Sequence, residues 1–170
     1  MIPSLLKGGF YHLGQVCISV QRIFAPKSKA KAIAQLLANG AVKLIVGNAI
    51  DESTECGHLF GLKKLTVLQL GLMKRWLQGQ NLLRAVNDWV KPAPSVLLEP
   101  PIDAKVSTME IFGPVVCVYG YDDIDQVIAQ ANWLEYAFQA SVFTKNIDVA
   151  MKAIRELEAT TVMVNDHTAF

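Results

Sequence analysis

Apolar and polar residues alternate in short stretches of this sequence, and segments with helical periodicity separate them. Residues 18–24 (ISVQRIF) alternate and include β-branched residues, which is typical of a half-buried strand that Pro26 would end. Ser28 is then expected to cap a helix over residues 29–37, and Asn39-Gly40 to stop it. This part of the chain therefore predicts a strand, a turn and a helix.

The second half of the chain repeats this order. Four strands are predicted there, over residues 96–98, 115–119, 139–144 and 161–165. Two helices alternate with them, over residues 124–133, with Asp122 or Asp123 as cap, and over residues 147–158. The second helix has an apolar face made of Ile147, Met151, Ile154 and Leu157. Strands and helices that alternate through short links predict an α/β fold, with a βαβ-type sheet flanked by helices and right-handed crossovers.

The stretch between Glu55 and Asp88 follows neither period clearly. It has no acidic residue and five basic ones, namely Lys63, Lys64, Lys74, Arg75 and Arg84. An incomplete apolar stripe from Leu65 to Trp76, broken by Gly71, favours a helix there, although only weakly.

Composition narrows the class of protein. The 170 residues suffice for one domain, and 52% of them are hydrophobic while 18% are charged, which excludes a disordered chain. The sequence contains neither a membrane-spanning run nor a signal peptide, so a cytoplasmic protein without a membrane partner is expected. A net charge of +1 without a basic, aromatic-rich stripe argues against a nucleic-acid partner.

The three cysteines, Cys17, Cys56 and Cys117, are expected to be reduced thiols. Their number and spacing fit neither a disulfide framework nor a zinc site, and the histidines have no companion ligands at metal spacing, so no metal is expected. Cys17 has glycines before it and a predicted strand after it, which would allow a tight turn and a rigidly held nucleophile. The alternative for Cys17 is a buried structural thiol.

The surroundings of Cys17 resemble a known family. Residues 8–22 (GGFYHLGQVCISVQR) are similar to the catalytic cysteine segment of the aldehyde dehydrogenase superfamily. Residues 110–115 (EIFGPV) resemble its Glu-x-Phe-Gly-Pro element, and residues 125–170 resemble the closing stretch of its catalytic domain. The three motifs follow one another in the order of that family, which makes the resemblance specific.

The resemblance implies an NAD(P)-dependent oxidation of a small-molecule aldehyde. Cys17 would attack the aldehyde carbon to give a thiohemiacetal, and the later thioester would pass to water or to coenzyme A. Glu110 would bind the nicotinamide ribose of NAD or NADP, Phe112 would pack near the nicotinamide, and Phe170 would line the substrate pocket. The alternatives are a solvated turn residue for Glu110 and core aromatic residues for Phe112 and Phe170.

The resemblance also implies that the chain is a fragment of a catalytic domain. Only sixteen residues precede Cys17, whereas the family carries its cofactor-binding domain, oxyanion-hole asparagine and general-base glutamate upstream of the cysteine. Residues 1–170 are thus expected to form a partial catalytic domain without the cofactor-binding domain. Within it, residues 61–93 do not match the family, and either compensating frameshifts or a divergent insertion would leave such an interval.

Three functions remain open on this basis. The first is an aldehyde dehydrogenase part that acts when another chain supplies the cofactor domain. The second is a catalytically inactive remnant or interaction module, which would associate with a full-length relative or with itself because its cut face is apolar. The third is a cysteine hydrolase that uses Cys17 with His12, which would cleave esters without a cofactor.

Overall fold

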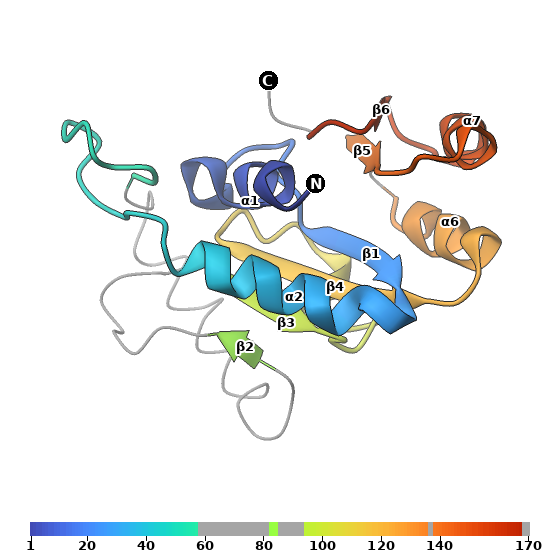
Figure 1. The fold of residues 1–170 in the computed structure, drawn as a ribbon, viewed down its shortest axis with the longest axis horizontal. Coiled ribbons are helices and arrows are strands. Elements are labelled where there is room, and N and C mark those ends of the chain that lie inside the picture. The colour runs from blue at the N-terminus through green and yellow to red at the C-terminus, as the bar shows by residue number, and fades with distance from the viewer. Residues whose placement is uncertain (58–81, 85–93, 136–137, 168–170) are drawn as a thin grey trace.

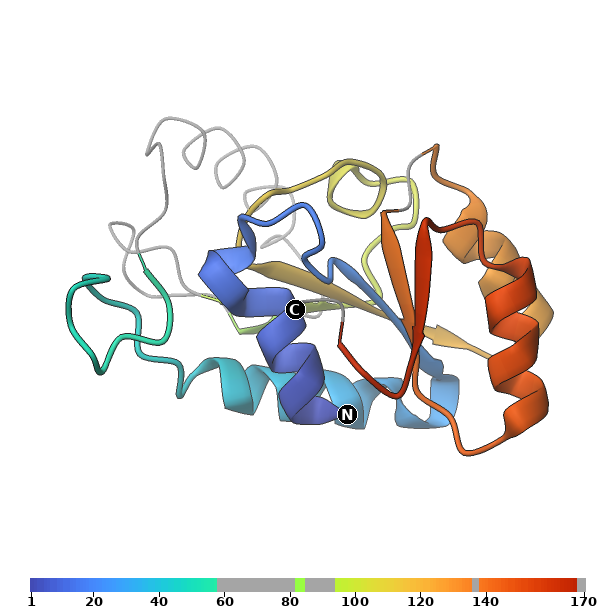
Figure 2. The same cartoon turned by 90° about the horizontal axis from the view of Figure 1, so that it is seen from above.

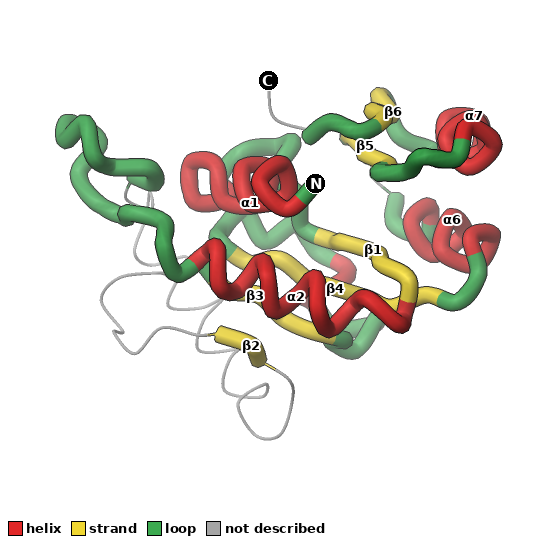
Figure 3. Tube along the Cα trace, in the orientation of Figure 1, coloured by secondary structure: helices red, strands yellow, loops and turns green. Residues whose placement is uncertain are grey.

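A computed structural model of the chain describes residues 1–57, 82–84, 94–135 and 138–167 (Figure 1). The described residues form two small sheets, with helices packed around them (Figure 3). No helix in these ranges is both long enough and apolar enough to cross a membrane.

The larger sheet has four strands in the order β1-β4-β3-β2. Their bounds are β1 Arg22–Pro26, β2 Leu82–Arg84, β3 Ser95–Leu98 and β4 Val115–Tyr121. Strands β1, β4 and β3 run parallel, and β2 is antiparallel to β3. A run of apolar residues makes β4 suitable for the centre of a parallel sheet, because both of its faces are covered.

Two apolar cores lie on opposite faces of this sheet, as the alternation along a strand requires. One core packs Val96, Val116 and Val118 against helices α1 (Ile2–Phe10) and α2 (Lys27–Ala41). The other core contains the alternate residues Leu97, Cys117 and Tyr119, together with Val106 of the short helix α5 (Lys105–Thr108) and Ile111.

The second sheet holds two parallel strands, β5 (Gln139–Val142) and β6 (Thr161–Val164). Helix α6 (Ile124–Asn132) leads into β5, and helix α7 (Ile147–Glu156) joins β5 to β6. The two helices lie side by side at this end of the molecule (Figure 2), where Lys152 of α7 pairs with Asp125 of α6 at 2.6 Å. Each helix begins at a side-chain cap, Asp123 for α6 and Asn146 for α7, since each side chain accepts a backbone N–H of the first turn.

The α/β class and the alternating order of strands and helices are confirmed, while three boundaries in the first third are corrected. The first strand begins at Arg22 rather than at residue 18, and α2 begins directly after Pro26, with no side-chain cap from Ser28. Gly40 does not stop α2, which continues to Ala41. A Cβ at Gly40 would lie 2.3 Å from the Leu6 side chain, so this glycine serves the close approach of α1 and α2.

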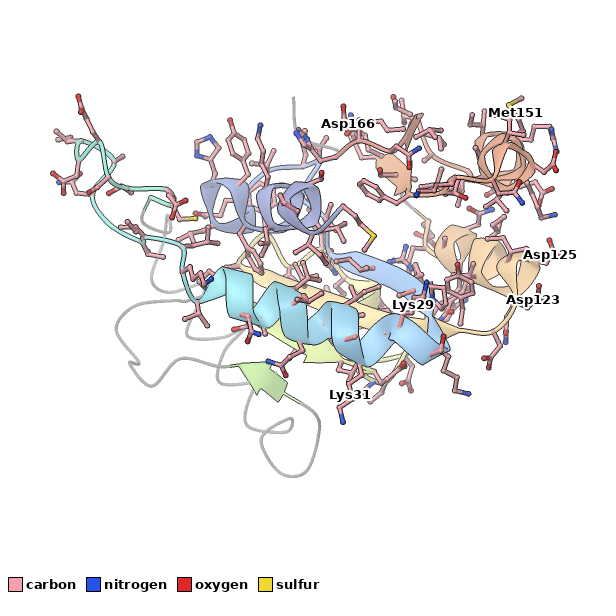
Figure 4. All side chains as sticks on the ribbon, viewed as in Figure 1. Lys29, Lys31, Asp123, Asp125, Met151 and Asp166 are labelled. Atoms are coloured by element: carbon pink, nitrogen blue, oxygen red, sulfur yellow. The ribbon has the colours of Figure 1, made fainter. Side chains whose placement is uncertain are left out.

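The predicted apolar face of α7 is largely exposed instead of buried. Ile147 is 70% exposed, and Met151 points outward from the helix (Figure 4). The small residues Ala150 and Ala153 make the buried face. Helices α1 and α5 and strand β2 had no counterpart among the predicted elements, and the weakly favoured helix from Leu65 to Trp76 lies outside the described residues.

Candidate functional site

Cys17 lies in a turn between a 3₁₀ helix, η1 (Tyr11–Gly14), and strand β1. The chain reaches this turn through three consecutive left-handed residues, with φ values of 47° at His12, 54° at Leu13 and 70° at Gly14. A hydrogen bond from the Ser19 N–H to the Val16 carbonyl, at 2.9 Å, closes the turn around the cysteine. The thiol is therefore presented by an exposed turn and not, as expected, by the first residue of a strand.

Glycines allow the cysteine turn to pack closely on its surroundings. A Cβ at Gly9 would lie 2.7 Å from the Val116 side chain, and a Cβ at Gly14 would lie 2.2 Å from the Gly113 carbonyl oxygen. The Val20 N–H donates to the Gly8 carbonyl at 2.9 Å. This bond holds the segment after the cysteine turn against helix α1. The predicted tight backbone turn before the cysteine is confirmed.

Glu110 and Phe112 lie in the loop between α5 and β4. The Glu110 carboxylate is exposed, which suits both a solvated turn residue and a ligand-binding group. Phe112 has a left-handed backbone, with φ of 51°, and its side chain is 48% exposed. The alternative of a core aromatic is therefore wrong for Phe112, because a core side chain would be excluded from water.

One cavity of about 780 Å³ brings Cys17, Glu110 and Phe112 together. Strand β1 and strand β5 supply much of its wall, with apolar side chains such as Ile23 and Val142. Polar side chains such as Arg22 and Ser141 line it as well, and a concave site with both apolar and polar groups can bind a small organic ligand. The structure does not describe Phe170, so the expected role of that residue in the substrate pocket is not addressed by it.

The three thiols differ in burial. Cys17 is exposed, so a buried structural role is wrong for it. Burial raises the pKa of the Cys117 thiol to about 12, and burial, followed by the charge of Glu55, raises the pKa of the Cys56 thiol. A thiol with a raised pKa is a weak nucleophile near neutral pH, which leaves Cys17 as the accessible candidate.

The structure does not favour a catalytic pair of Cys17 and His12. The His12 ring packs against Tyr11, with 4.1 Å between the ring centroids, and no hydrogen bond joins His12 to Cys17 within the described ranges. The same ranges contain no group of three or more His, Cys, Asp or Glu residues that could hold a metal ion. His58 lies outside them.

Sequence reasoning missed one residue of the site, Gln21. Its side-chain amide contacts the backbone on both sides of Glu110, across a separation of about ninety residues in sequence. Glutamine carries no distinctive chemistry, and a position in an alternating stretch only predicts a polar, outward side chain. The available signal was its place in the cysteine motif, residues 8–22.

Comparisons with known proteins agree with this geometry. The profile described as "Aldehyde dehydrogenase family" matches residues 1–170. The 3-sulfolactaldehyde dehydrogenase of Priestia aryabhattai is 37% identical over 162 residues, which are 95% of this chain and 34% of that protein.

Solved structures give the same result. Aldehyde dehydrogenase 21 from Physcomitrella patens, in complex with succinate, superposes with a TM-score of 0.91 at 29% identity, over 99% of this chain and 35% of that one. Glyceraldehyde-3-phosphate dehydrogenase from Methanocaldococcus jannaschii, complexed with NADP, gives 0.90 at 30% identity, over 99% and 37%. Betaine aldehyde dehydrogenase from Staphylococcus aureus, in complex with NAD+, gives 0.89 at 26% identity, over 99% and 35%. The chain spans about a third of the length of these relatives, and it belongs to the aldehyde dehydrogenase family.

Proposed function

We propose that this chain carries the thiol half of an NAD(P)-dependent aldehyde-oxidising site, with Cys17 as the nucleophile. The observation that carries this proposal is the exposed Cys17 thiol in one cavity with Glu110 and Phe112. Related aldehyde dehydrogenases have been solved with NAD+ or with NADP, which supports a dinucleotide as the redox partner. The cofactor domain would come from another chain or segment.

The residues present fit a nicotinamide nucleotide. The exposed Glu110 carboxylate can accept hydrogen bonds from the two hydroxyls of a ribose, because an ionised carboxylate offers acceptors only. The half-exposed Phe112 ring can pack against a flat heterocycle. The bound nucleotide would supply a hydride acceptor, and Glu110 and Phe112 would orient it toward the cysteine turn.

The chain's own residues would perform the remaining steps. The Cys17 thiolate forms a bond from sulfur to the aldehyde carbon, and the carbonyl oxygen becomes an oxyanion that takes a proton or a hydrogen bond. The backbone N–H of Cys17 makes no hydrogen bond with the described residues and can donate to this oxyanion. Loss of hydride from the thiohemiacetal carbon leaves a thioester on Cys17.

The cycle ends when an acceptor attacks the thioester. A water molecule, or the thiol of an acceptor such as coenzyme A, forms the new bond to the acyl carbon while the bond to sulfur breaks. The cysteine leaves as a thiolate and is ready for the next turnover. Attack by water also requires a general base.

Activity of the purified chain tests this proposal, assayed alone and together with a full-length aldehyde dehydrogenase whose own nucleophilic cysteine is replaced by alanine. Aldehydes for which relatives are named, 3-sulfolactaldehyde, lactaldehyde and betaine aldehyde, would be offered with NAD or NADP, and formation of the reduced nucleotide would be measured. We expect Cys17→Ala to abolish the signal and Cys56→Ala to keep it, since Cys56 is buried away from the cavity. Turnover that survives Cys17→Ala would disprove the nucleophile assignment.

A second candidate function, an inactive interaction module, is favoured by the exposed apolar face of α7. Ile147 is 70% exposed, Met151 43% and Ile154 45%, which is a contiguous stripe on one helix. No turnover, together with no dinucleotide-dependent shift in melting temperature, would favour this function. Sizing chromatography of the wild type and of Ile154→Lys would then show whether the stripe holds two copies together.

A further inference from the structure

Gln21 connects the cysteine turn to the Glu110 loop through its side-chain amide. The Nε2 group donates to the Met109 carbonyl at 2.6 Å and to the Val106 carbonyl at 3.1 Å. The Oε1 atom accepts from the Ile111 N–H at 3.0 Å. Both backbone neighbours of Glu110 are therefore held by the same amide group.

The backbone of Gln21 is fixed as firmly as its side chain. Its carbonyl accepts from the Cys117 N–H at 2.8 Å, which anchors Gln21 to the central strand β4. Three residues separate it from Cys17, and the next residue, Arg22, begins β1. The cysteine turn, the central strand and the Glu110 loop thus meet at one residue.

Among the polar side chains, glutamine has both the amide group and the length that this position uses. Two carbonyls face the amide NH₂, and one N–H faces the amide oxygen, so three hydrogen bonds are made with a single orientation of the amide. Asparagine is one methylene shorter. Ionised glutamate would place an acceptor against two carbonyl oxygens, and methionine has the length but neither donor nor comparable acceptor.

We propose that Gln21 is a positioning residue that holds Glu110 and Phe112 at a fixed place relative to Cys17. This inference deepens the proposed function and rests on it, because the geometry matters only if Cys17 and Glu110 serve one reaction. Without the amide link, the loop would keep its anchor at β4 but lose the connection on the cysteine side. The nucleotide half of the site would then move independently of the thiol.

Hydrogen exchange of the intact chain tests the link directly. In Gln21→Met, the Ile111 amide should exchange about tenfold faster, which corresponds to the loss of one ordinary hydrogen bond. The matched control is Gln35→Met, because Gln35 is an exposed residue of α2 whose side-chain amide donates to Asn39 of the same helix at 3.0 Å. Unchanged exchange at Ile111 in Gln21→Met would overturn the proposal.

Two further readouts separate positioning from general stability. Amides of β4 should keep their exchange rates in Gln21→Met, and an equal acceleration of β4 and Ile111 would show global loosening and overturn the proposal. In Gln21→Glu, a neutral carboxyl can both donate and accept, so protection of Ile111 should return when the pH is lowered until that carboxyl is protonated. Loss of protection at every pH in Gln21→Glu would also count against the link.

The nucleotide supplies the functional readout. We expect Gln21→Met to weaken dinucleotide binding several-fold while the rate of Cys17 alkylation without nucleotide stays the same. If the wild type binds the dinucleotide and Gln21→Met binds it equally well, the positioning role is overturned. If the wild type binds no dinucleotide, the proposed function fails, and the exchange experiment still decides whether Gln21 fixes the loop.

Discussion

Gly14 and Gly113 pack backbone against backbone, and a Cβ on Gly14 would lie only 2.2 Å from the Gly113 carbonyl oxygen. Gly14 lies three residues before Cys17, and Gly113 follows Phe112. The two motifs on either side of the cavity are thus in direct contact through residues without side chains. Close backbone approach of this kind is a main reason for glycine at a fixed position.

Replacement of Gly14 by alanine should be strongly destabilising. Its φ of 70° costs an alanine roughly 1–2 kcal/mol, and the overlap with Gly113 adds to this cost. We expect a loss of at least about 2 kcal/mol in the free energy of unfolding, measured by urea denaturation. Gly113→Ala is the matched control, because a Cβ there would make ordinary contacts with the Ile111 side chain at 3.6 Å and with the Ile111 carbonyl oxygen at 3.9 Å. Equal stability losses in the two variants would contradict this explanation.

The sequence predicted the regular parts of the fold because they depend on local periodicity. The apolar run in β4 and the cap Asp123 are signals within a few residues, and the structure follows them. The glycine at position 40 misled the prediction, because its role depends on Leu6 of another helix. Burial of α7 was mispredicted for a similar reason, since alanines face the interior and the large apolar residues face outward.

The candidate site could be predicted only through motifs. Cys17, Glu110 and Phe112 were identified by resemblance, and the structure places them around one cavity. Gln21 belongs to the cysteine motif, but the motif did not indicate its role, because that role lies in hydrogen bonds to Met109 and Ile111 that no local pattern encodes. Contacts between segments far apart in sequence are what periodicity leaves undetermined.

Selective labelling should distinguish Cys17 from the other thiols. In the native chain, a small alkylating reagent should modify Cys17 first, because Cys56 and Cys117 are buried and their pKa values are raised by burial. Intact-mass measurements should show a single addition under native conditions and three in denaturant. Prompt modification of Cys117 in the folded chain would contradict the buried position of that residue.

Asn165 should stabilise the end of β6 through a reciprocal pair of hydrogen bonds. Its side chain accepts from the Thr144 N–H and donates to the Thr144 carbonyl, both at 2.9 Å, while its own φ is 60°. Alanine loses both bonds and strains the backbone, whereas glycine loses the bonds alone. Asn165→Ala should therefore be about 1 kcal/mol less stable than Asn165→Gly in thermal unfolding. Equal melting temperatures for the two variants would show that the left-handed backbone carries no cost.

Alkaline pH should destabilise the chain through Cys117. The ordinary pKa of a cysteine thiol is 9.0, and burial raises the pKa of Cys117 to about 12 in the folded chain. Between these values the unfolded chain has released the thiol proton and the folded chain has not, so the unfolded state binds fewer protons and stability falls as the pH rises. The contribution of this group to the free energy of unfolding is fully present below pH 9. Above that pH, the free energy of unfolding falls by up to roughly 1.4 kcal/mol per pH unit.

Urea unfolding at a series of pH values would measure this slope, with Cys117→Ala and Cys117→Ser as variants. Both remove the titrating thiol, so both should flatten the decline, even though alanine leaves a small void and serine a buried hydroxyl. Tyr119, whose pKa is raised by burial from 10.0, and the buried Cys56 act in the same direction, so some decline should persist in the variants. An identical slope in the wild type and both variants would contradict the assignment, because the alkaline sensitivity would then come from groups other than Cys117.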